Sequence, residues 1–387
     1  MYPKLKNSAL KMAESPFLYN YLKDEIYELD SEAFDLLKYF TGKNSLESII
    51  GNPSKEVKEL IDFLVSEGCI EDSQMKHTYD MFNVVENSKP SLRYLQMHIT
   101  TKCNLDCAHC YLGKKSDIDM EKKLAFKIID EFSEVGWKLL ITGGEPLLSS
   151  YFWDILKYAS KKPLRIEVFT NGTLLTESMA EKLGVYVHMV QISLDGLETG
   201  HEILRGRGTF KSTIKGIKNA RKYVEVSIAT MIHSRNLKEF PELSELIEEL
   251  DIEGWSLDVP SSKGNLEVRQ ELIPDYKEAA RIYSSYGFSN EMHLGSENFA
   301  CGSHLMSVSV DGSITKCGFF DRSLGRIGKI SLMEGWKKVV KNFVPDLQEL
   351  ECRECINLRE CRGGCRYRAE LNGDFLARDP FMCTFME

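Results

Sequence analysis

The sequence predicts an α/β fold built on a partial (β/α)6 TIM-like barrel, with a smaller region on either side of it. Apolar segments of strand composition alternate with amphipathic helical segments along the middle of the chain. The candidate strands are residues 95–100, 138–144, 165–172, 188–196, 224–230 and 255–260. This rhythm is typical of parallel strands joined by right-handed crossovers. An incomplete barrel over residues 90–290 is the preferred arrangement, and a doubly wound sheet is the alternative.

Residues 1–85 precede the barrel and predict a small winged-helix domain. Residues 29–40 and 54–68 carry apolar side chains at helical spacing, and residues 17–22 and 25–29 have strand composition. Winged helices often bind DNA, but the first 90 residues hold 10 Lys, no Arg and 16 Asp or Glu, a net charge of 10 − 16 = −6. Because DNA-binding domains normally have a basic face, no nucleic-acid partner is expected.

Residues 291–387 follow the barrel and contain seven of the eleven cysteines. Little regular periodicity is present there apart from one predicted helix at residues 331–343. A segment with so few repeating apolar positions needs another source of folding energy, and bound metal can supply it.

The bulk composition narrows the class of protein further. The 387 residues are 43% hydrophobic and carry a net charge of −9, which disfavours nucleic-acid and anionic membrane partners. No apolar run has the length of a membrane span and the N-terminus lacks a signal-peptide core, so a cytoplasmic protein is expected. Eleven cysteines in such a chain indicate metal or redox chemistry rather than disulfides. Cys69 lies outside the two cysteine clusters and is expected to be a buried apolar residue.

Cys103, Cys107 and Cys110 directly follow the first predicted barrel strand, in the segment "CNLDCAHC". Active sites collect at the C-terminal ends of parallel strands, and thiolates select zinc or iron–sulfur clusters. A structural zinc site would need a fourth ligand, and His109 adjoins Cys110 too closely to reach the same metal easily. An iron–sulfur cubane could instead use three thiolates and leave one iron open. The spacing alone is compatible with both a structural zinc site and an iron–sulfur cluster.

This segment resembles the CxxxCxxC loop of radical S-adenosylmethionine (SAM) enzymes, with His109 as the aromatic residue before the last cysteine. The resemblance implies a [4Fe-4S] cluster on these three cysteines, with SAM as the fourth ligand of the open iron. In that family the reduced cluster cleaves SAM to give a 5′-deoxyadenosyl radical. The three cysteines would therefore be the catalytic residues.

Further motifs of the same family follow at the ends of later predicted strands. "TGGEP" resembles the motif that binds the SAM amino group, "TNG" resembles a segment near the adenosine, and "SLDG" with a later arginine resembles the contacts to the SAM carboxylate and ribose. Physically, glycines permit close backbone approach and arginine suits a carboxylate. The SAM-binding residues implied are His109, Thr142, Gly143, Gly144, Glu145, Pro146, Thr170, Asn171, Ser193, Asp195 and Arg205.

The C-terminal cysteines form a second pattern. A CxxC followed by CxxxC would suit a zinc ribbon. The whole spacing, however, resembles the seven-cysteine SPASM extension of radical SAM enzymes, which binds two auxiliary iron–sulfur clusters. The resemblance implies that both are [4Fe-4S] clusters and that one of them is held by Cys352, Cys355, Cys361 and Cys383. The other is held by Cys301, Cys317 and Cys365, and its fourth position is an open iron, a side chain such as His304, or a substrate ligand.

The N-terminal region resembles, on pattern and length, the PqqD-like domain that binds leader segments of ribosomally made precursor peptides. Together these resemblances imply a radical SAM maturase that modifies a precursor peptide, by thioether or carbon–carbon cross-linking, with an electron donor such as flavodoxin or ferredoxin. The first alternative is a radical SAM enzyme acting on a haem-like tetrapyrrole, whose C-terminal pattern is similar. The second is a zinc-binding winged-helix regulator.

Overall fold

One curved sheet of parallel strands forms the centre of the protein. The computed structural model describes residues 1–387 except 74–81, 83, 114–115 and 289–297. The strand order is β11-β10-β9-β8-β7-β6-β12-β13. The six parallel strands that follow each other along the chain are β6 (Tyr94–His98), β7 (Lys138–Thr142), β8 (Arg165–Thr170), β9 (Met189–Ser193), β10 (Glu225–Met231) and β11 (Gly254–Asp258). The predicted α/β fold is confirmed, because each strand overlaps a predicted strand segment and extends beyond it by at most one residue.

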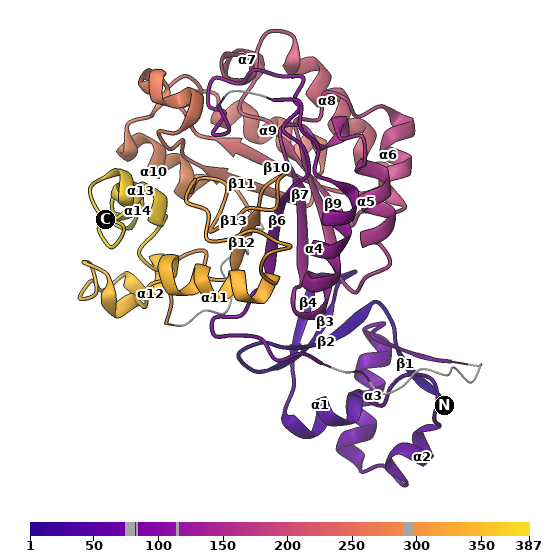
Figure 1. The fold of residues 1–387 in the computed structure, drawn as a ribbon. Helices are drawn as coiled ribbons and strands as arrows, with labels where there is room; N and C mark the ends of the chain where they lie inside the picture. Colours follow the sequence, from indigo (N-terminus) through magenta and orange to yellow (C-terminus); the bar gives the residue numbers. More distant parts are fainter. Residues whose placement is uncertain (74–81, 83, 114–115, 289–297) are drawn as a thin grey trace.

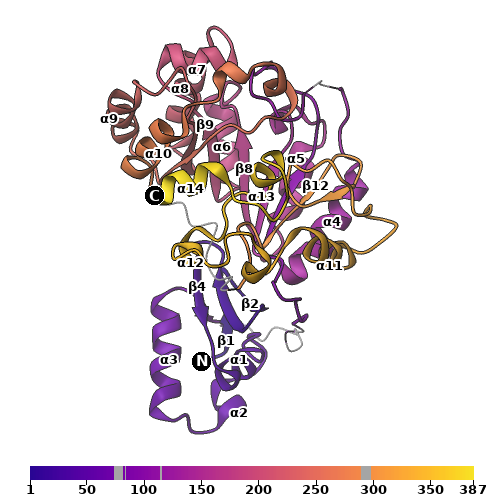
Figure 2. The same ribbon diagram turned by 90° about the vertical axis from the view of Figure 1, so that its left-hand side faces the viewer.

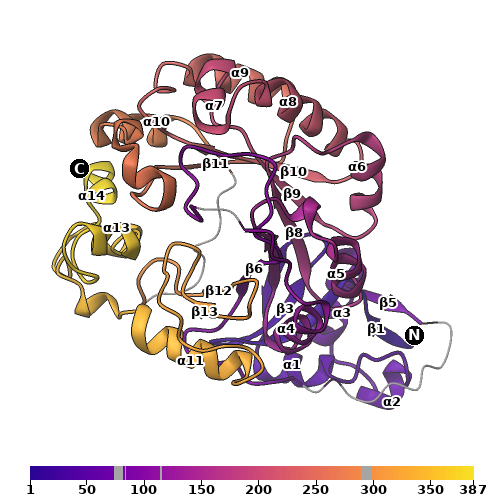
Figure 3. The same ribbon diagram turned by 45° about the horizontal axis from the view of Figure 1, so that its top comes forward.

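Helices cover the outer side of this sheet, as Figure 3 shows. They are α4 (Lys122–Val135), α5 (Phe152–Ala159), α6 (Glu177–Gly184), α8 (Thr209–Ala220) and α9 (Phe240–Leu250). Their apolar faces share one core with alternate strand residues such as Leu95, Ile141 and Val190. A doubly wound sheet would have helices on both faces, so the barrel-like arrangement is the one observed. Helix α7 (Glu198–Arg205) follows β9, and α10 (Tyr276–Ser285) follows β11 and the short turns η2 (Gly264–Val268) and η3 (Gln270–Leu272).

The C-terminal region contributes to the same sheet, which the sequence did not predict. Strand β12 (Leu305–Val308) pairs parallel to β6, and β13 (Ile314–Thr315) pairs antiparallel to β12. Strands this short carry too little periodicity to be recognised. Helix α11 (Leu332–Phe343) is the predicted helix, and η4 (Leu347–Glu349), α12 (Leu358–Cys361), α13 (Arg366–Leu371) and α14 (Pro380–Met386) complete the chain. The predicted boundary at residues 290–291 lies outside the described residues.

The N-terminal region has its own small core. Strands β2 (Ser8–Met12), β3 (Pro16–Asn20) and β4 (Glu25–Glu28) form an antiparallel sheet, while β1 (Pro3–Leu5) pairs with β5 (Ile70–Asp72). Helices α1 (Ser31–Leu37), α2 (Leu46–Ile50) and α3 (Lys55–Ser66) each begin at an Asp or Ser whose side chain caps the first turn. The predicted segments at 29–40 and 54–68 contain α1 and α3, whose buried residues line this core.

The N-terminal region lies against the base of the barrel, below the sheet in Figures 1 and 2. Trp137, just before β7, stacks on Tyr19 at a ring distance of 5.4 Å. Lys138, at the start of β7, pairs with Asp24, and the Nη1 of Arg165 at the start of β8 donates to the carbonyl of Leu22 (2.9 Å). These contacts are buried, so the N-terminal region is fixed at the end of the barrel where its parallel strands begin.

No described helix is both long enough and apolar enough to cross a membrane.

Candidate active site

The cysteine loop, residues 101–113, leaves the C-terminal end of β6, at the end of the barrel opposite the N-terminal region (Figure 1). All eleven cysteines of the chain are thiols rather than disulfides. Burial raises the pKa of the Cys107 thiol to about 11, Arg205 opposes this, and Cys110 and Cys103 raise it further. The three predicted thiols of this loop therefore lie within electrostatic range of one another and of a buried cation.

The two glycines of "TGGEP" bring the end of β7 directly against the cysteine loop. Gly144 N–H donates to the carbonyl of Thr100 (2.9 Å), and Glu145 N–H donates to the carbonyl of Lys102 (2.7 Å). A Cβ at Gly143 would lie 2.4 Å from the Thr100 oxygen, and one at Gly144 would lie 2.3 Å from the Lys102 oxygen. A side chain at either position would therefore collide with the backbone of the cysteine loop, which explains why both residues are glycine. The motif alone predicts instead that the glycines permit close approach of a ligand.

Glu145 is a fully buried carboxylate that joins the ends of β7 and β8. It accepts hydrogen bonds from the Thr170 hydroxyl (2.8 Å), the Asn171 N–H (2.9 Å) and the Leu147 N–H (3.2 Å). Burial raises the pKa of Glu145 to about 7, and these donors oppose that rise. Pro146 then begins the turn η1 (Pro146–Leu148). The carboxylate thus has three partners within the protein itself.

Asparagine side chains connect the cysteine loop to the end of β8. Asn171 Nδ2 donates to Asn104 Oδ1 (2.9 Å), and Asn104 Nδ2 donates to Thr173 Oγ1 (2.8 Å). The Asn171 Oδ1 also accepts from the Thr173 N–H (2.9 Å). Asn104 was missed as a candidate residue, although it lies between two of the predicted cysteines.

Arg205, at the end of α7, forms a buried ion pair with Asp195 after β9. Arg205 Nε donates to Asp195 Oδ2 (2.5 Å), and Asp195 also accepts from the Met231 N–H (2.9 Å). Burial raises the pKa of Asp195, but Arg205 holds it well below its usual value. Nε is only one of the five donors of a guanidinium. Ser193 is the last residue of β9 and lies two positions before Asp195, and it is half-buried.

His109 lies between two of the loop cysteines and is held neutral. Burial, with Arg205 nearby, lowers the pKa of His109 to about 4. Its buried Nδ1 has no hydrogen-bond partner among the described residues. The imidazole therefore offers one neutral ring nitrogen beside the thiols.

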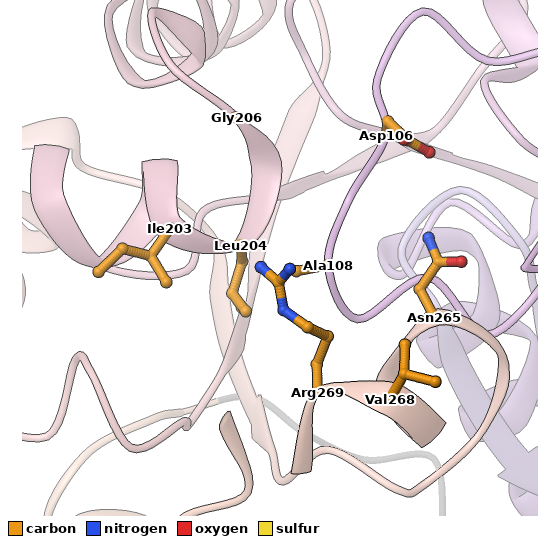
Figure 4. Close-up of a pocket in the computed structure, with 8 residues that line it drawn as sticks. All are labelled: Asp106, Ala108, Ile203, Leu204, Gly206, Asn265, Val268 and Arg269. Atoms are coloured by element: carbon orange, nitrogen blue, oxygen red, sulfur yellow. The ribbon is translucent and has the colours of Figure 1, made fainter. Parts of the chain in front are cut away.

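The turns after β11 form hydrogen bonds with the backbone of the cysteine loop. Asn265 Nδ2 donates to the Cys107 carbonyl (2.9 Å), and Asn265 N–H donates to the Cys110 carbonyl (3.0 Å). A pocket of about 300 Å³ opens here, and Figure 4 shows Arg269 extending from η2 and η3 across it toward Ala108 and Leu204. No motif in the sequence marked Asn265, because its role depends on a loop more than 150 residues away in the chain.

The C-terminal cysteines gather in two groups. Burial raises the pKa of the Cys361 thiol, and Cys352 and Cys355 raise it further. Burial likewise raises the pKa of the Cys383 thiol, and Cys352 and Cys361 raise it further. These four thiols are therefore close together, as the resemblance implied for one cluster.

The remaining three C-terminal cysteines surround Lys316. Burial lowers the pKa of Lys316 to about 8, and Cys317, Cys301 and Cys365 oppose this fall. His304, the suggested side-chain ligand, has its Nδ1 turned to other partners: it donates to the Ser91 carbonyl (2.7 Å) and lies 3.9 Å from Glu14 Oε1 of the N-terminal region. Its Nε2 is buried and has no hydrogen-bond partner in the described part of the chain.

These donor sets suit iron–sulfur chemistry better than a single ion. In the described residues, no group of three or more His, Cys, Asp or Glu side chains is arranged to hold one metal ion. The sets nevertheless consist of thiols alone, and thiolates are the usual ligands of iron–sulfur clusters. Arg205 beside the loop thiols and Lys316 beside the three-cysteine group are buried cations that can offset their charge. The residues present therefore fit the cofactor that the motifs imply.

Comparison with known proteins identifies the class. Residues 97–247 match the model of the radical SAM superfamily. The protein is a radical SAM enzyme, and the domain implies SAM and a [4Fe-4S] cluster as cofactors.

Individual relatives differ in the substrates that their names record. The chain is 26% identical over 353 residues to AdoMet-dependent heme synthase of Oleidesulfovibrio alaskensis, covering 79% of this chain and 90% of that protein. It is 26% identical over 306 residues to mycofactocin maturase MftC of Mycobacterium tuberculosis, covering 70% and 77%. The SAM-bound structure of Streptococcus suis SuiB has the same fold, with a TM-score of 0.69, 16% identity and coverage of 98% of this chain and 99% of that one.

Proposed function

We propose that the protein is a maturase that modifies a ribosomally made precursor peptide by radical chemistry, forming a thioether or carbon–carbon cross-link. Residues 1–85 would recognise the leader, residues 90–290 would form the radical SAM barrel, and residues 291–387 would hold two auxiliary clusters. The observation that carries the proposal is an open strand edge in the N-terminal region. The fold shared with SuiB along 98% of the chain, and solved SuiB with its precursor peptide SuiA, support it.

The open edge is β4, which pairs only with β3 in the described part of the N-terminal sheet. Phe63 on α3 is 47% exposed and packs edge-on against Tyr27 of β4, with ring centroids 5.6 Å apart. Ile26 of β4 is 36% exposed. An extended peptide can add to such an edge through backbone hydrogen bonds and place apolar side chains beside Phe63 and Ile26.

In the barrel, Cys103, Cys107 and Cys110 would hold the cluster, and bound SAM would then supply the radical that takes a hydrogen atom from the peptide. Arg205 would bind the SAM carboxylate with the donors that Asp195 leaves, because Nε alone faces Asp195. Glu145 would act mainly by fixing the strand ends around the cysteine loop. The proposed SAM contacts are His109, Thr142, Gly143, Gly144, Glu145, Pro146, Thr170, Asn171, Ser193, Asp195 and Arg205.

The two C-terminal thiol groups would each hold one auxiliary cluster, and such clusters supply a site for one-electron transfer or for a substrate thiolate. Lys316 would compensate negative charge at the three-cysteine group, since its Nζ already donates to the Leu305 carbonyl (3.1 Å) and lies near all three thiols. A flavodoxin or ferredoxin would deliver electrons to the cysteine loop.

A second candidate function is modification of a tetrapyrrole side chain. It is favoured by the curated relatives named heme synthase, which match 75–79% of this chain at 26–28% identity. That function would give the open β4 edge no role.

Substitution of Phe63 by Asp tests leader recognition. The probe is the short peptide encoded next to the gene, incubated with cluster-loaded enzyme, SAM and dithionite and followed by mass spectrometry. We expect Phe63→Asp to lower modification of the peptide by about tenfold or more relative to SAM cleavage, because a charge would face the added strand.

Val65→Asp is the matched control, because Val65 lies on the same helix, is 44% exposed and is two positions away from the face that contacts β4. It should leave both rates unchanged. Equal modification by the Phe63→Asp enzyme would exclude leader binding at this edge, and conversion of iron-coproporphyrin III instead of the peptide would favour the second function.

A further inference from the structure

One row of side chains runs across the inner face of all six parallel strands. Strand register pairs His98 with Thr142, Phe169 with Gln191, Gln191 with Ser227 and Ser227 with Gly254. Thr142 follows the registered pair Ile141 and Val168 by one residue and so adjoins Phe169. The neighbouring positions on these strands point outward, into the core beneath the helices. The row therefore faces the interior of the barrel.

This row is polar, unlike the interior of a closed barrel. Closed (β/α)8 barrels fill their centre with layers of bulky branched side chains. Here the row carries an imidazole, two hydroxyls and an amide, and only Phe169 is apolar. Phe169 and Gln191 remain half-buried, although both lie in the middle of the sheet. The interior is therefore built to accept a polar molecule.

Two members of the row have polar atoms without partners. His98 is 5% exposed, and neither Nδ1 nor Nε2 has a hydrogen-bond partner among the described residues. The Oγ of Ser227, which is 7% exposed, is also unpartnered there. Buried polar atoms are nearly always hydrogen-bonded in native proteins, so such atoms need an explanation. Their strands lie at different positions in the sheet, and both point into the same interior.

The row also carries no net charge. Burial lowers the pKa of His98 to about 4, so its ring is neutral at physiological pH. Lys263, whose charge also lowers the pKa of His98, is bound to Asp321 (2.6 Å) and to the Gly318 carbonyl (3.3 Å). The layer directly below the row contains Glu167, and the cations two layers below, Lys138 and Arg165, are paired with carboxylates. Among the residues that the structure describes, a ligand with several carboxylates would therefore find no unpaired cation within this row.

We infer that His98, Gln191 and Ser227 bind the backbone amide groups of the substrate, and so select a neutral peptide segment over a carboxylate-bearing tetrapyrrole. This inference rests on the proposed peptide-modifying function. The ring of Tyr111, the residue after Cys110, contacts His98 edge-on with centroids 6.2 Å apart. His98 therefore lies next to the loop that carries the predicted radical-generating cysteines, where a bound segment would meet the radical.

The test combines ligand binding with thermal stability in the cluster-loaded enzyme. The probes are the capped peptide acetyl-(Ala)4-amide, which offers only neutral amides, and iron-coproporphyrin III. We expect His98→Phe and Ser227→Ala each to weaken peptide binding by about threefold to tenfold. Both variants should keep the melting temperature or raise it by about 1–3 °C, because an orphaned polar group is removed.

Thr230→Val is the matched control, because Thr230 is a buried hydroxyl on β10 with two partners. Its Oγ1 donates to the Leu194 carbonyl (2.6 Å) and accepts from Trp255 Nε1 (2.8 Å), so the melting temperature of this variant should fall. Unchanged binding of both probes, with a fall in melting temperature like that of the control, would overturn the assignment of the row and leave the peptide function standing. Tight porphyrin binding that His98→Phe weakens, without peptide binding, would overturn the peptide function as well.

Discussion

Removing the Arg205 guanidinium has two separable consequences, one for folding and one for SAM. Asp195 is 1% exposed and Arg205 is its ionic partner, so Arg205→Ala leaves a buried carboxylate without its cation. Breaking a buried pair in this way typically costs about 3–5 kcal/mol. Loss of a charge-assisted contact to the SAM carboxylate would in addition weaken SAM binding by about ten- to a hundredfold.

The double variant Asp195→Asn/Arg205→Ala separates these effects. With no buried charge left, its free energy of unfolding should return most of the way to the wild-type value, while its SAM affinity stays low. Urea unfolding followed by tryptophan fluorescence measures the first quantity, and anaerobic equilibrium dialysis with the cluster-loaded enzyme measures the second. Recovery of SAM affinity in the double variant would refute the proposed SAM contact, because Arg205 would then act only through Asp195.

The stability lost in Arg205→Ala should depend on pH in a defined direction. The pKa of Asp195 is depressed in the folded protein, so the ion pair stabilises the fold above the unfolded pKa of about 4 and this contribution is lost as pH falls further. In Arg205→Ala the largest cause of this depression is removed, so the pKa of Asp195 rises. The destabilisation of this variant should therefore be largest at neutral pH and should shrink as acid protonates Asp195. A penalty that does not change between pH 7 and pH 4 would argue against the ionic explanation.

Two further predictions concern the cysteine loop. Changing its three cysteines to Ala should abolish 5′-deoxyadenosine formation under dithionite and leave the iron of the C-terminal cysteines in place; retained SAM cleavage would exclude this loop as the radical source. Gly144→Ala should lower the iron bound by the loop, because its Cβ would lie 2.3 Å from the Lys102 oxygen. Gly51→Ala should not, because it adds backbone strain at a φ of 65° but places its Cβ in open space far from the loop. Equal iron content in the two glycine variants would contradict that reasoning.

The parallel sheet was predictable because its strands are long enough to show their composition. In each of β6 to β11, apolar residues that face the helices, such as Val190 and Ile192, alternate with residues that face the barrel interior. Each of these strands is also followed by an amphipathic helix. Strand β12 was not predictable, because its four residues become part of the sheet only by pairing with β6, more than 200 residues earlier in the chain. Long-range pairing of a short segment leaves almost no local pattern.

The site was predictable to the level of residue types and positions, but not of partners. The motifs indicated Glu145, Asp195 and Arg205 as contacts of a ligand. In the structure Glu145 bonds Thr170 and two backbone donors, and Arg205 bonds Asp195. A motif shows that a carboxylate is needed at a strand end. It does not show whether that carboxylate serves the ligand or the scaffold, because both uses require the same residue.

The two ends of the barrel are organised differently, and this determines how recognition can be tested. At the base, Asp24 of the N-terminal region pairs with Lys138 and Tyr19 stacks on Trp137, so these two contacts exist only while both regions are present. Deleting residues 1–85 would leave Lys138 without Asp24 and would expose Trp137, and loss of activity would then report on folding. Phe63 lies on the surface away from these contacts, so changing it alters the proposed peptide edge and leaves the base intact.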